Sequence, residues 1–278
     1  PRSTVMTEHD VRINASSDPG SERPNEDHFA TGEDMVVVLD GATARTETGC
    51  THGVAWYVRH LADAIVDHPD SPPENALALA IVQTANQRRT CDLQHPGTPS
   101  AAVAILQARQ GTLRYLVLGD VTMVADTRRG LKIVTDNRVS ETARAERAVA
   151  DALRNGSPQK TEALVRMKQA ELAARNVPGG FWIATADPRV VKHALIGEFA
   201  LADVVRVALL TDGAARAVEP LHIHDWASLM ALLASAGPEE LIRQVRAVES
   251  KDPDATRWPR NKIHDDATVV VAEFDRQE

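Results

Sequence analysis

Runs of aliphatic residues that end abruptly in an aspartate restrict the fold of this chain more than any other feature. Three such runs end at or just before Asp40, Asp120 and Asp212. The acidic pair Asp265-Asp266 instead stands immediately before an aliphatic run. Buried strands that stop at an acid gather their acids at one rim of a sheet, where carboxylates repel one another unless a cation lies between them. The pattern therefore predicts a divalent-metal site at a sheet edge.

Alternating or fully apolar runs predict strands along most of the chain. They are expected at 4–13, 35–39, 101–106, 113–118, 121–126, 131–135, 181–184, 204–210 and 267–274. Helical spacing of apolar residues predicts helices at 49–66, from Pro73 onward, and at about 225–234 and 238–248. Because strands and helices do not alternate strictly, we expect an α+β fold in which an antiparallel sandwich is flanked by helices.

Charge and composition narrow the classes of function. The chain has 31 Lys+Arg against 39 Asp+Glu, a formal net charge of -8. This balance disfavours a nucleic acid or an anionic membrane as the main partner. No stretch is apolar over the roughly 18 to 20 residues that a bilayer span needs, and the first residues lack a signal-peptide core. We therefore expect a cytoplasmic protein.

The two cysteines give no sign of a functional site in the sequence. Cys50 and Cys91 form no C-x-x-C pair and lack the spacing of a zinc site. So few thiols suit a reducing cytoplasm, and we expect both residues to be ordinary. A cysteine phosphatase needs an arginine at a fixed distance after its cysteine, where this chain has Trp56 and Gly97. That class is excluded.

The order of the acidic motifs resembles that of the metal-dependent protein phosphatases, the type 2C serine/threonine phosphatases, and matches bacterial members best. The motifs are Arg23-Pro24-Asn25-Glu26-Asp27, Val37-Val38-Leu39-Asp40-Gly41, Gly97-Thr98, Leu118-Gly119-Asp120, Leu210-Thr211-Asp212-Gly213 and Asp265-Asp266-Ala267-Thr268. Each motif alone is common, but together they span nearly the whole chain. The resemblance implies a single domain over residues 1–278, a four-layer α-β-β-α sandwich, with a flap insertion at about 136–180.

The resemblance also implies a site for two Mg²⁺ or Mn²⁺ ions, with a third recruited through Asp120 and Asp212. The implied metal ligands are Glu26, Asp27, Asp40, Gly41, Asp120, Asp212 and Asp265. Hard cations of this kind prefer carboxylate and carbonyl oxygens. By resemblance Asp40 bridges the two ions, and Arg23, Asp40 and Asp212 are the catalytic residues. Arg23 would clamp the phosphate, since a guanidinium can bind two phosphoryl oxygens at once.

The implied reaction is hydrolysis of phosphoserine or phosphothreonine in a protein by a hydroxide that bridges the two metals, opposing a Ser/Thr kinase. Ala42 stands where the family usually has a leaving-group acid. A weak or inactive phosphatase-like regulatory binding protein is therefore one alternative, and a small-molecule phosphate monoesterase is another. Arg45 and His52 could each reach a substrate, although such residues more often cap or line a helix. The sequence leaves the oligomeric state unknown.

Overall fold

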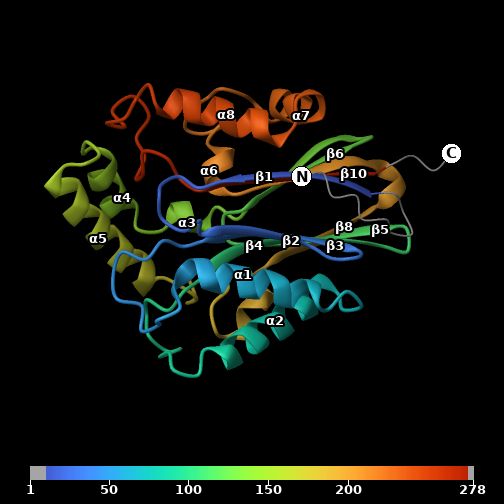
Figure 1. The fold of residues 1–278 in the computed structure, drawn as a ribbon, viewed down its shortest axis with the longest axis horizontal. Coiled ribbons are helices and arrows are strands. Elements are labelled where there is room, and N and C mark those ends of the chain that lie inside the picture. Colours follow the sequence, from blue (N-terminus) through green and yellow to red (C-terminus); the bar gives the residue numbers. More distant parts are fainter. Residues whose placement is uncertain (1–10, 275–278) are drawn as a thin grey trace.

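Two five-stranded antiparallel sheets pack face to face at the centre of the molecule (Figure 1). The computed structural model describes residues 11–274. The first sheet has the order β1-β10-β9-β6-β7, with β1 (Val11–Asp18), β10 (Ala267–Phe274), β9 (Val204–Leu210), β6 (Thr122–Thr127) and β7 (Gly130–Val134). The second has the order β2-β3-β4-β5-β8, with β2 (Asp27–Thr31), β3 (Met35–Gly41), β4 (Ala101–Arg109), β5 (Thr112–Leu118) and β8 (Leu195–Ala200).

Helices cover the outer face of each sheet. In Figure 1, α1 (Gly53–Val66) and α2 (Pro73–Gln87) lie against the second sheet, while α7 (Trp226–Ser235) and α8 (Pro238–Glu249) lie over the first. The short helix α6 (Asp212–Ala215) follows β9 directly. At one end of the sandwich stand α3 (Arg138–Glu141), α4 (Arg144–Asp151) and α5 (Pro158–Ala173). This arrangement confirms the expected α-β-β-α sandwich.

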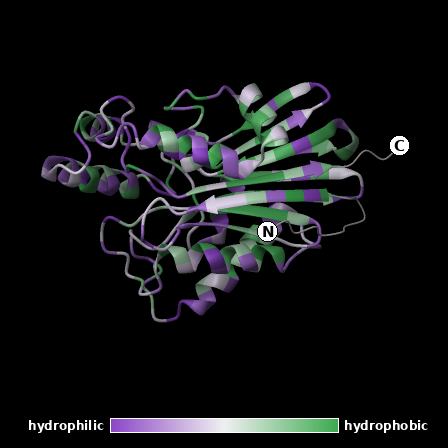
Figure 2. Cartoon of the chain, turned by 45° about the horizontal axis from the view of Figure 1, so that its top comes forward, coloured by the Kyte–Doolittle hydropathy of each residue, from purple (hydrophilic) through white to green (hydrophobic). Residues whose placement is uncertain are grey.

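Three apolar layers hold these elements together, and β3 shows why its sequence is continuously apolar. Val37 and Leu39 pack toward α1 and α2, whereas Val36 and Val38 pack into the layer between the sheets. A third layer joins the first sheet to α7 and α8. Strands buried on both faces lose the usual alternation of polar and apolar residues. Figure 2 shows the hydrophobic colouring concentrated along these strands.

Most of the predicted elements are confirmed within a few residues. Strands are present at the positions expected from 35–39, 101–106, 113–118, 121–126, 131–135, 204–210 and 267–274. The predicted helices correspond to α1, α2, α7 and α8. Among residues 11–274, no helix is both long and apolar enough to cross a membrane.

Three further expectations had different outcomes. For the strand predicted at 4–13, residues 4–10 lie outside the described part, and β1 runs on to Asp18. The strand predicted at 181–184 is reduced to isolated bridges, because the backbone N–H of Ile183 donates to the side chain of Asn176 instead of a neighbouring strand. Strands β2 and β8 were not predicted. β8 lies at the sheet edge and exposes Leu195 and Ile196, so it lacks the clear alternation of a half-buried strand.

Candidate metal centre and substrate hollow

Strand register brings the predicted acids to one rim where the two sheets meet. Asp27 at the start of β2 is the direct partner of Asp40 at the end of β3. On the other sheet, Asp212 follows β9 and Asp265 precedes β10, which pair with each other. The backbone N–H of Asp212 donates to Oδ2 of Asp40 at 3.1 Å, and this hydrogen bond connects the edges of the two sheets. Acids from distant parts of the sequence therefore surround one point.

Close backbone packing fixes the position of Asp40 and its neighbours. The N–H of Gly41 donates to the carbonyl of Glu26 at 3.0 Å, and a Cβ at Gly41 would come within 2.4 Å of that oxygen. Asp27 is only 5% exposed, and its Oδ2 accepts from the hydroxyl of Thr211 at 2.7 Å. Glycine is required at position 41 because any side chain there would strike the Glu26 backbone.

Burial and mutual repulsion make these carboxylates hard to ionise together. Burial raises the pKa of Asp40 well above its ordinary value, and the charges of Asp212, Asp27 and Asp120 raise it further. Burial likewise raises the pKa of Asp120 to about 7, with Asp212 adding to the rise. A multivalent cation would offset this repulsion. The set offers oxygen donors alone, so it suits a hard ion such as Mg²⁺ or Mn²⁺.

Asp265 differs from the other acids because two side-chain cations already hold it. Arg216 Nη2 donates to its Oδ2 at 2.7 Å, and Lys262 Nζ donates to its Oδ1. Burial alone would raise the pKa of Asp265, but Arg216 and Lys262 outweigh that effect and lower it. A metal at Asp265 would have to share the carboxylate with these groups. The sequence analysis missed both cations, although the position of Lys262 three residues before Asp265 was a usable signal.

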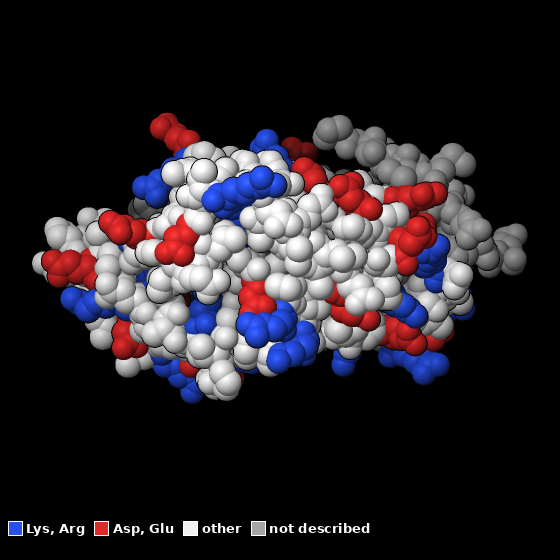
Figure 3. Space-filling view, turned by 90° about the horizontal axis from the view of Figure 1, so that it is seen from below, with Lys and Arg blue, Asp and Glu red and all other residues white. Residues whose placement is uncertain are grey.

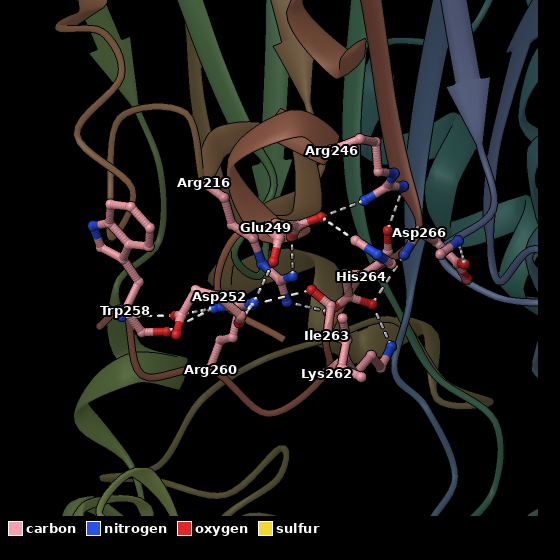
Figure 4. Close-up of polar contacts among 12 residues, drawn as sticks. Arg216, Arg246, Glu249, Asp252, Trp258, Arg260, Lys262, Ile263, His264 and Asp266 are labelled. Atoms are coloured by element: carbon pink, nitrogen blue, oxygen red, sulfur yellow. Dashed lines mark hydrogen bonds and ion pairs between the residues drawn. The ribbon is translucent and has the colours of Figure 1, made fainter. Parts of the chain in front are cut away.

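A buried polar network holds the 250–266 loop, which carries Lys262 and Asp265 (Figure 4). Glu249 is fully buried and accepts from Arg216 at 2.7 Å, from Arg246 at 3.0 Å and from His264 Nδ1 at 2.8 Å. Asp252 and Arg260 form a second buried ion pair, at 2.8 Å. Buried ion pairs of this kind fix geometry, since losing one partner leaves an uncompensated charge.

The acids open into a hollow of about 160 Å³, which we call the acidic hollow. Its lining includes Asp40, Gly41, Asp120, Asp212 and Asp265, together with Arg45, Arg147, Lys168, Glu171 and Lys262. A second hollow of about 570 Å³, the outer hollow, adjoins it. Arg23 and Glu26 line the outer hollow, and Thr43, Arg45, Asn261 and Lys262 line both. The predicted phosphate clamp Arg23 therefore lies beside the acids rather than among them, whereas Arg45 lies between the two hollows.

Helices α4 and α5 form one wall of the acidic hollow. Ala150, Ala163, Leu164 and Met167 give them a small apolar core of their own. Glu171 pairs with Arg147 at 2.8 Å and with Lys168 at 3.3 Å. At the start of this segment Arg138 donates to the His193 carbonyl at 2.8 Å, and at its end Arg175 donates to the Thr98 carbonyl at 2.9 Å. The predicted flap is thus anchored at both ends.

The exposed charges on the face covered by α1 and α2 are mixed. Figure 3 shows Lys and Arg interspersed with Asp and Glu there, rather than gathered into one basic patch. This distribution agrees with the net charge of -8. It gives no electrostatic footprint for nucleic acid on that face.

Comparison with known proteins assigns the family. The family model described as protein phosphatase 2C matches residues 17–246. The chain therefore belongs to the protein phosphatase 2C family. No curated protein sequence matches the chain closely enough to count as a relative.

Solved structures share the fold at low sequence identity. The catalytic domain of the serine threonine protein phosphatase PstP, in complex with two manganese ions, is 16% identical with a TM-score of 0.54, covering 96% of this chain and 99% of its own. A serine-threonine phosphatase 2C from Toxoplasma gondii is 12% identical with a TM-score of 0.58. The match covers 99% of this chain and 98% of the Toxoplasma chain. Stp1 from Staphylococcus aureus is 12% identical with a TM-score of 0.56, covering 99% of both chains.

Proposed function

We propose that this protein hydrolyses phosphoserine and phosphothreonine in proteins, using Mg²⁺ or Mn²⁺ as cofactor. The observation that carries the proposal is the convergence of acids from both sheets, with the N–H of Asp212 bonded to Asp40. Membership of the protein phosphatase 2C family supports the phosphatase activity. The two manganese ions bound by PstP, which shares the fold, support the choice of cofactor.

We propose that the acids gathered at the edges of the two sheets, Asp40 among them, would hold the ions, together with the Gly41 carbonyl. The proposed ligands are Glu26, Asp27, Asp40, Gly41, Asp120, Asp212 and Asp265. Bound divalent ions would neutralise these acids, orient the phosphate and acidify water for in-line attack on phosphorus. Thr43 Oγ1 donates to Glu26 Oε2 at 2.5 Å, so Glu26 is already oriented toward the junction of the two hollows.

Arg45 and Arg23 are the proposed phosphate-binding residues. Arg45 lines both hollows, and its Nη2 lies 3.5 Å from the Asn261 carbonyl, leaving most of its donors for another partner. Arg23 is exposed on the outer hollow, where it can meet the substrate as it enters. A guanidinium binds two phosphoryl oxygens and keeps its charge at any relevant pH. The phosphoprotein substrate would come from a Ser/Thr kinase.

The decisive experiment is phosphate release from p-nitrophenyl phosphate and from a phosphothreonine peptide. It compares EDTA, Mg²⁺ and Mn²⁺ for the wild type and Asp212→Asn. We expect metal-dependent release from both esters, with a loss of at least about a hundredfold in the variant. A folded wild type that releases phosphate from neither ester would refute the proposal. Release from p-nitrophenyl phosphate alone would favour the small-molecule monoesterase.

A regulatory binding protein is the second candidate, and the state of Asp265 favours it. Arg216 and Lys262 already neutralise that carboxylate, and Ala42 cannot supply a proton to a leaving group. Such a protein would bind Mn²⁺ and a phosphopeptide without turnover. Asp40→Asn would then leave phosphopeptide binding intact, whereas in an enzyme it would abolish turnover.

The single-domain organisation and the cytoplasmic location stay predictions.

A further inference from the structure

Cys50 and Cys91 meet at the surface although 41 positions separate them, and their sulfurs are 2.6 Å apart. Cys50 lies in the 42–52 segment between β3 and α1, and Cys91 lies in the 88–100 segment between α2 and β4. Both side chains are partly exposed. The sequence predicted two ordinary cysteines, since pairing between distant loops leaves no spacing signal in the sequence.

Other bonds hold the two segments in place, so the meeting of the sulfurs is built into the backbone. The N–H of Asp92 donates to the carbonyl of Gly49 at 2.8 Å. The Thr48 hydroxyl accepts the Cys50 N–H at 3.2 Å and donates to the Cys50 carbonyl at 3.0 Å. Gly49 has a φ of +64°, and a Cβ there would lie 2.6 Å from His95. The two segments are therefore closely fitted at this point.

A histidine completes the cluster. His52 Nδ1 lies 3.2 Å from the sulfur of Cys91 and 3.6 Å from that of Cys50. The ring also packs on Trp56, with centroids 4.4 Å apart. His52 is thus in contact with the thiols, and this contact gives it a role that the sequence did not indicate. Its Nδ1 can accept a thiol proton.

The distance between the sulfurs favours one of two chemistries for this cluster. A disulfide bond is about 2.0 Å long. Two thiolates on one tetrahedral zinc ion, each about 2.3 Å from the metal, are about 3.8 Å apart. The observed 2.6 Å is nearer to the disulfide length than to the separation across a zinc ion, although Cys50, His52 and Cys91 lie close enough together to share an ion. We propose that Cys50 and Cys91 are a redox-active pair that a peroxide converts reversibly into a disulfide, with His52 as the proton acceptor.

The reaction balances with hydrogen peroxide as oxidant. His52 takes the proton from Cys91, and the thiolate attacks one peroxide oxygen. The O–O bond breaks, and the leaving hydroxide takes the proton from His52, giving water and a sulfenic acid on Cys91. The Cys50 sulfur then attacks the Cys91 sulfur, the S–O bond breaks, and a second water leaves with the Cys50 proton. Two thiols are oxidised to one disulfide while one peroxide is reduced to two waters.

The environment of the two thiols supports Cys91 as the attacking group. Burial would raise the pKa of Cys91, but hydrogen bonds from Cys50 and from the backbone N–H groups of Thr51 and His52 outweigh it and lower the pKa. Burial raises the pKa of Cys50. The thiolate is the reactive form, and Cys50 is the resolving thiol. The bond would fasten the segment that carries Thr43 and Arg45 to the 88–100 segment.

The test uses the full chain, first reduced, then treated with hydrogen peroxide, alkylated and mapped as peptides without reductant. We expect one crosslink between the Cys50 and Cys91 peptides, lighter by two hydrogen atoms and reversed by dithiothreitol. Cys50→Ser should stop at a sulfenic acid on Cys91, which dimedone traps. His52→Gln should slow the loss of free thiol by at least about tenfold. His60→Gln is the matched control, since His60 lies on α1 and stacks on the same Trp56.

Two results would overturn the proposal. In the first, peroxide yields no crosslink within one chain, because both thiols stay fully alkylatable or because disulfides form only between chains. In the second, equimolar Zn²⁺ protects both thiols from alkylation and peroxide then yields no crosslink after the zinc is chelated, which would make the cluster a metal site. The chain has only two cysteines, so each product is assigned unambiguously. Neither result depends on phosphatase activity.

Discussion

The sheet rims and the 250–266 loop supply opposite charges to the same hollow, but they do so by different means. Asp40 and Asp212 stand where strands end, and hydrogen-bonded register fixes them. Lys262 belongs to a loop without regular structure, and Arg216 just follows α6. Their positions depend on buried ion pairs, above all those of Glu249. Asp40 and Asp212 are therefore held by backbone geometry, whereas the cations, and Asp265 with them, are held by side-chain electrostatics.

The largest expected effect is on stability, and it comes from removing Arg216, which pairs with Glu249. Arg216→Met leaves the fully buried Glu249 with less compensation, and we expect a loss of about 3 kcal/mol in the free energy of unfolding. Urea unfolding in EDTA measures it. The control is Arg243→Met, since Arg243 pairs with Glu240 on the exposed side of α8 and should change little. Equal midpoints for the two variants would show that the Glu249 network does not hold the loop.

The buried acids should give the stability of the metal-free protein an unusual dependence on pH. The folded pKa of Asp120 is raised to about 7, above its unfolded value, so the folded state binds the proton more tightly. Stability is therefore greatest below the unfolded pKa and falls as pH rises toward 7. In EDTA we expect about 2 to 3 kcal/mol less stability at pH 8 than at pH 5. Asp120→Asn should make this dependence shallower without removing it, because the pKa of Asp40 is also raised. An unchanged slope would mean that Asp120 is solvated.

The smallest expected effect is on metal affinity, and it concerns the contact between Lys262 and Asp265. Lys262→Met removes the ammonium that competes for this carboxylate, so Mn²⁺ should bind about fivefold more tightly. Titration calorimetry of the folded protein measures the affinity. Lys251→Met, at an exposed lysine of the same loop, is the control and should leave the affinity unchanged. Weaker binding in Lys262→Met would mean that the lysine orients Asp265 for the metal instead of competing with it.

The confirmed predictions share one physical basis. Valine-rich apolar runs such as 35–39 and 267–274 favour central strands, which are buried on both faces. The acid at the end of such a run must then lie at a rim. Where a contact outside a regular strand takes the backbone hydrogen bond, as Asn176 does for Ile183, the apolar pattern misled the prediction.

By itself the sequence determined the sandwich and the gathering of Asp40, Asp120 and Asp212, because strand burial is a local consequence of apolar runs. Only the tertiary structure decided which side chains from the loops contact the acids and which contact one another. Lys262 on Asp265, and Cys50 on Cys91, are contacts between side chains of loops. Loop paths are set by long-range packing and buried ion pairs rather than by periodicity, so apolar periodicity could not reveal these contacts. Only the three-residue spacing of Lys262 and Asp265 pointed to one of them.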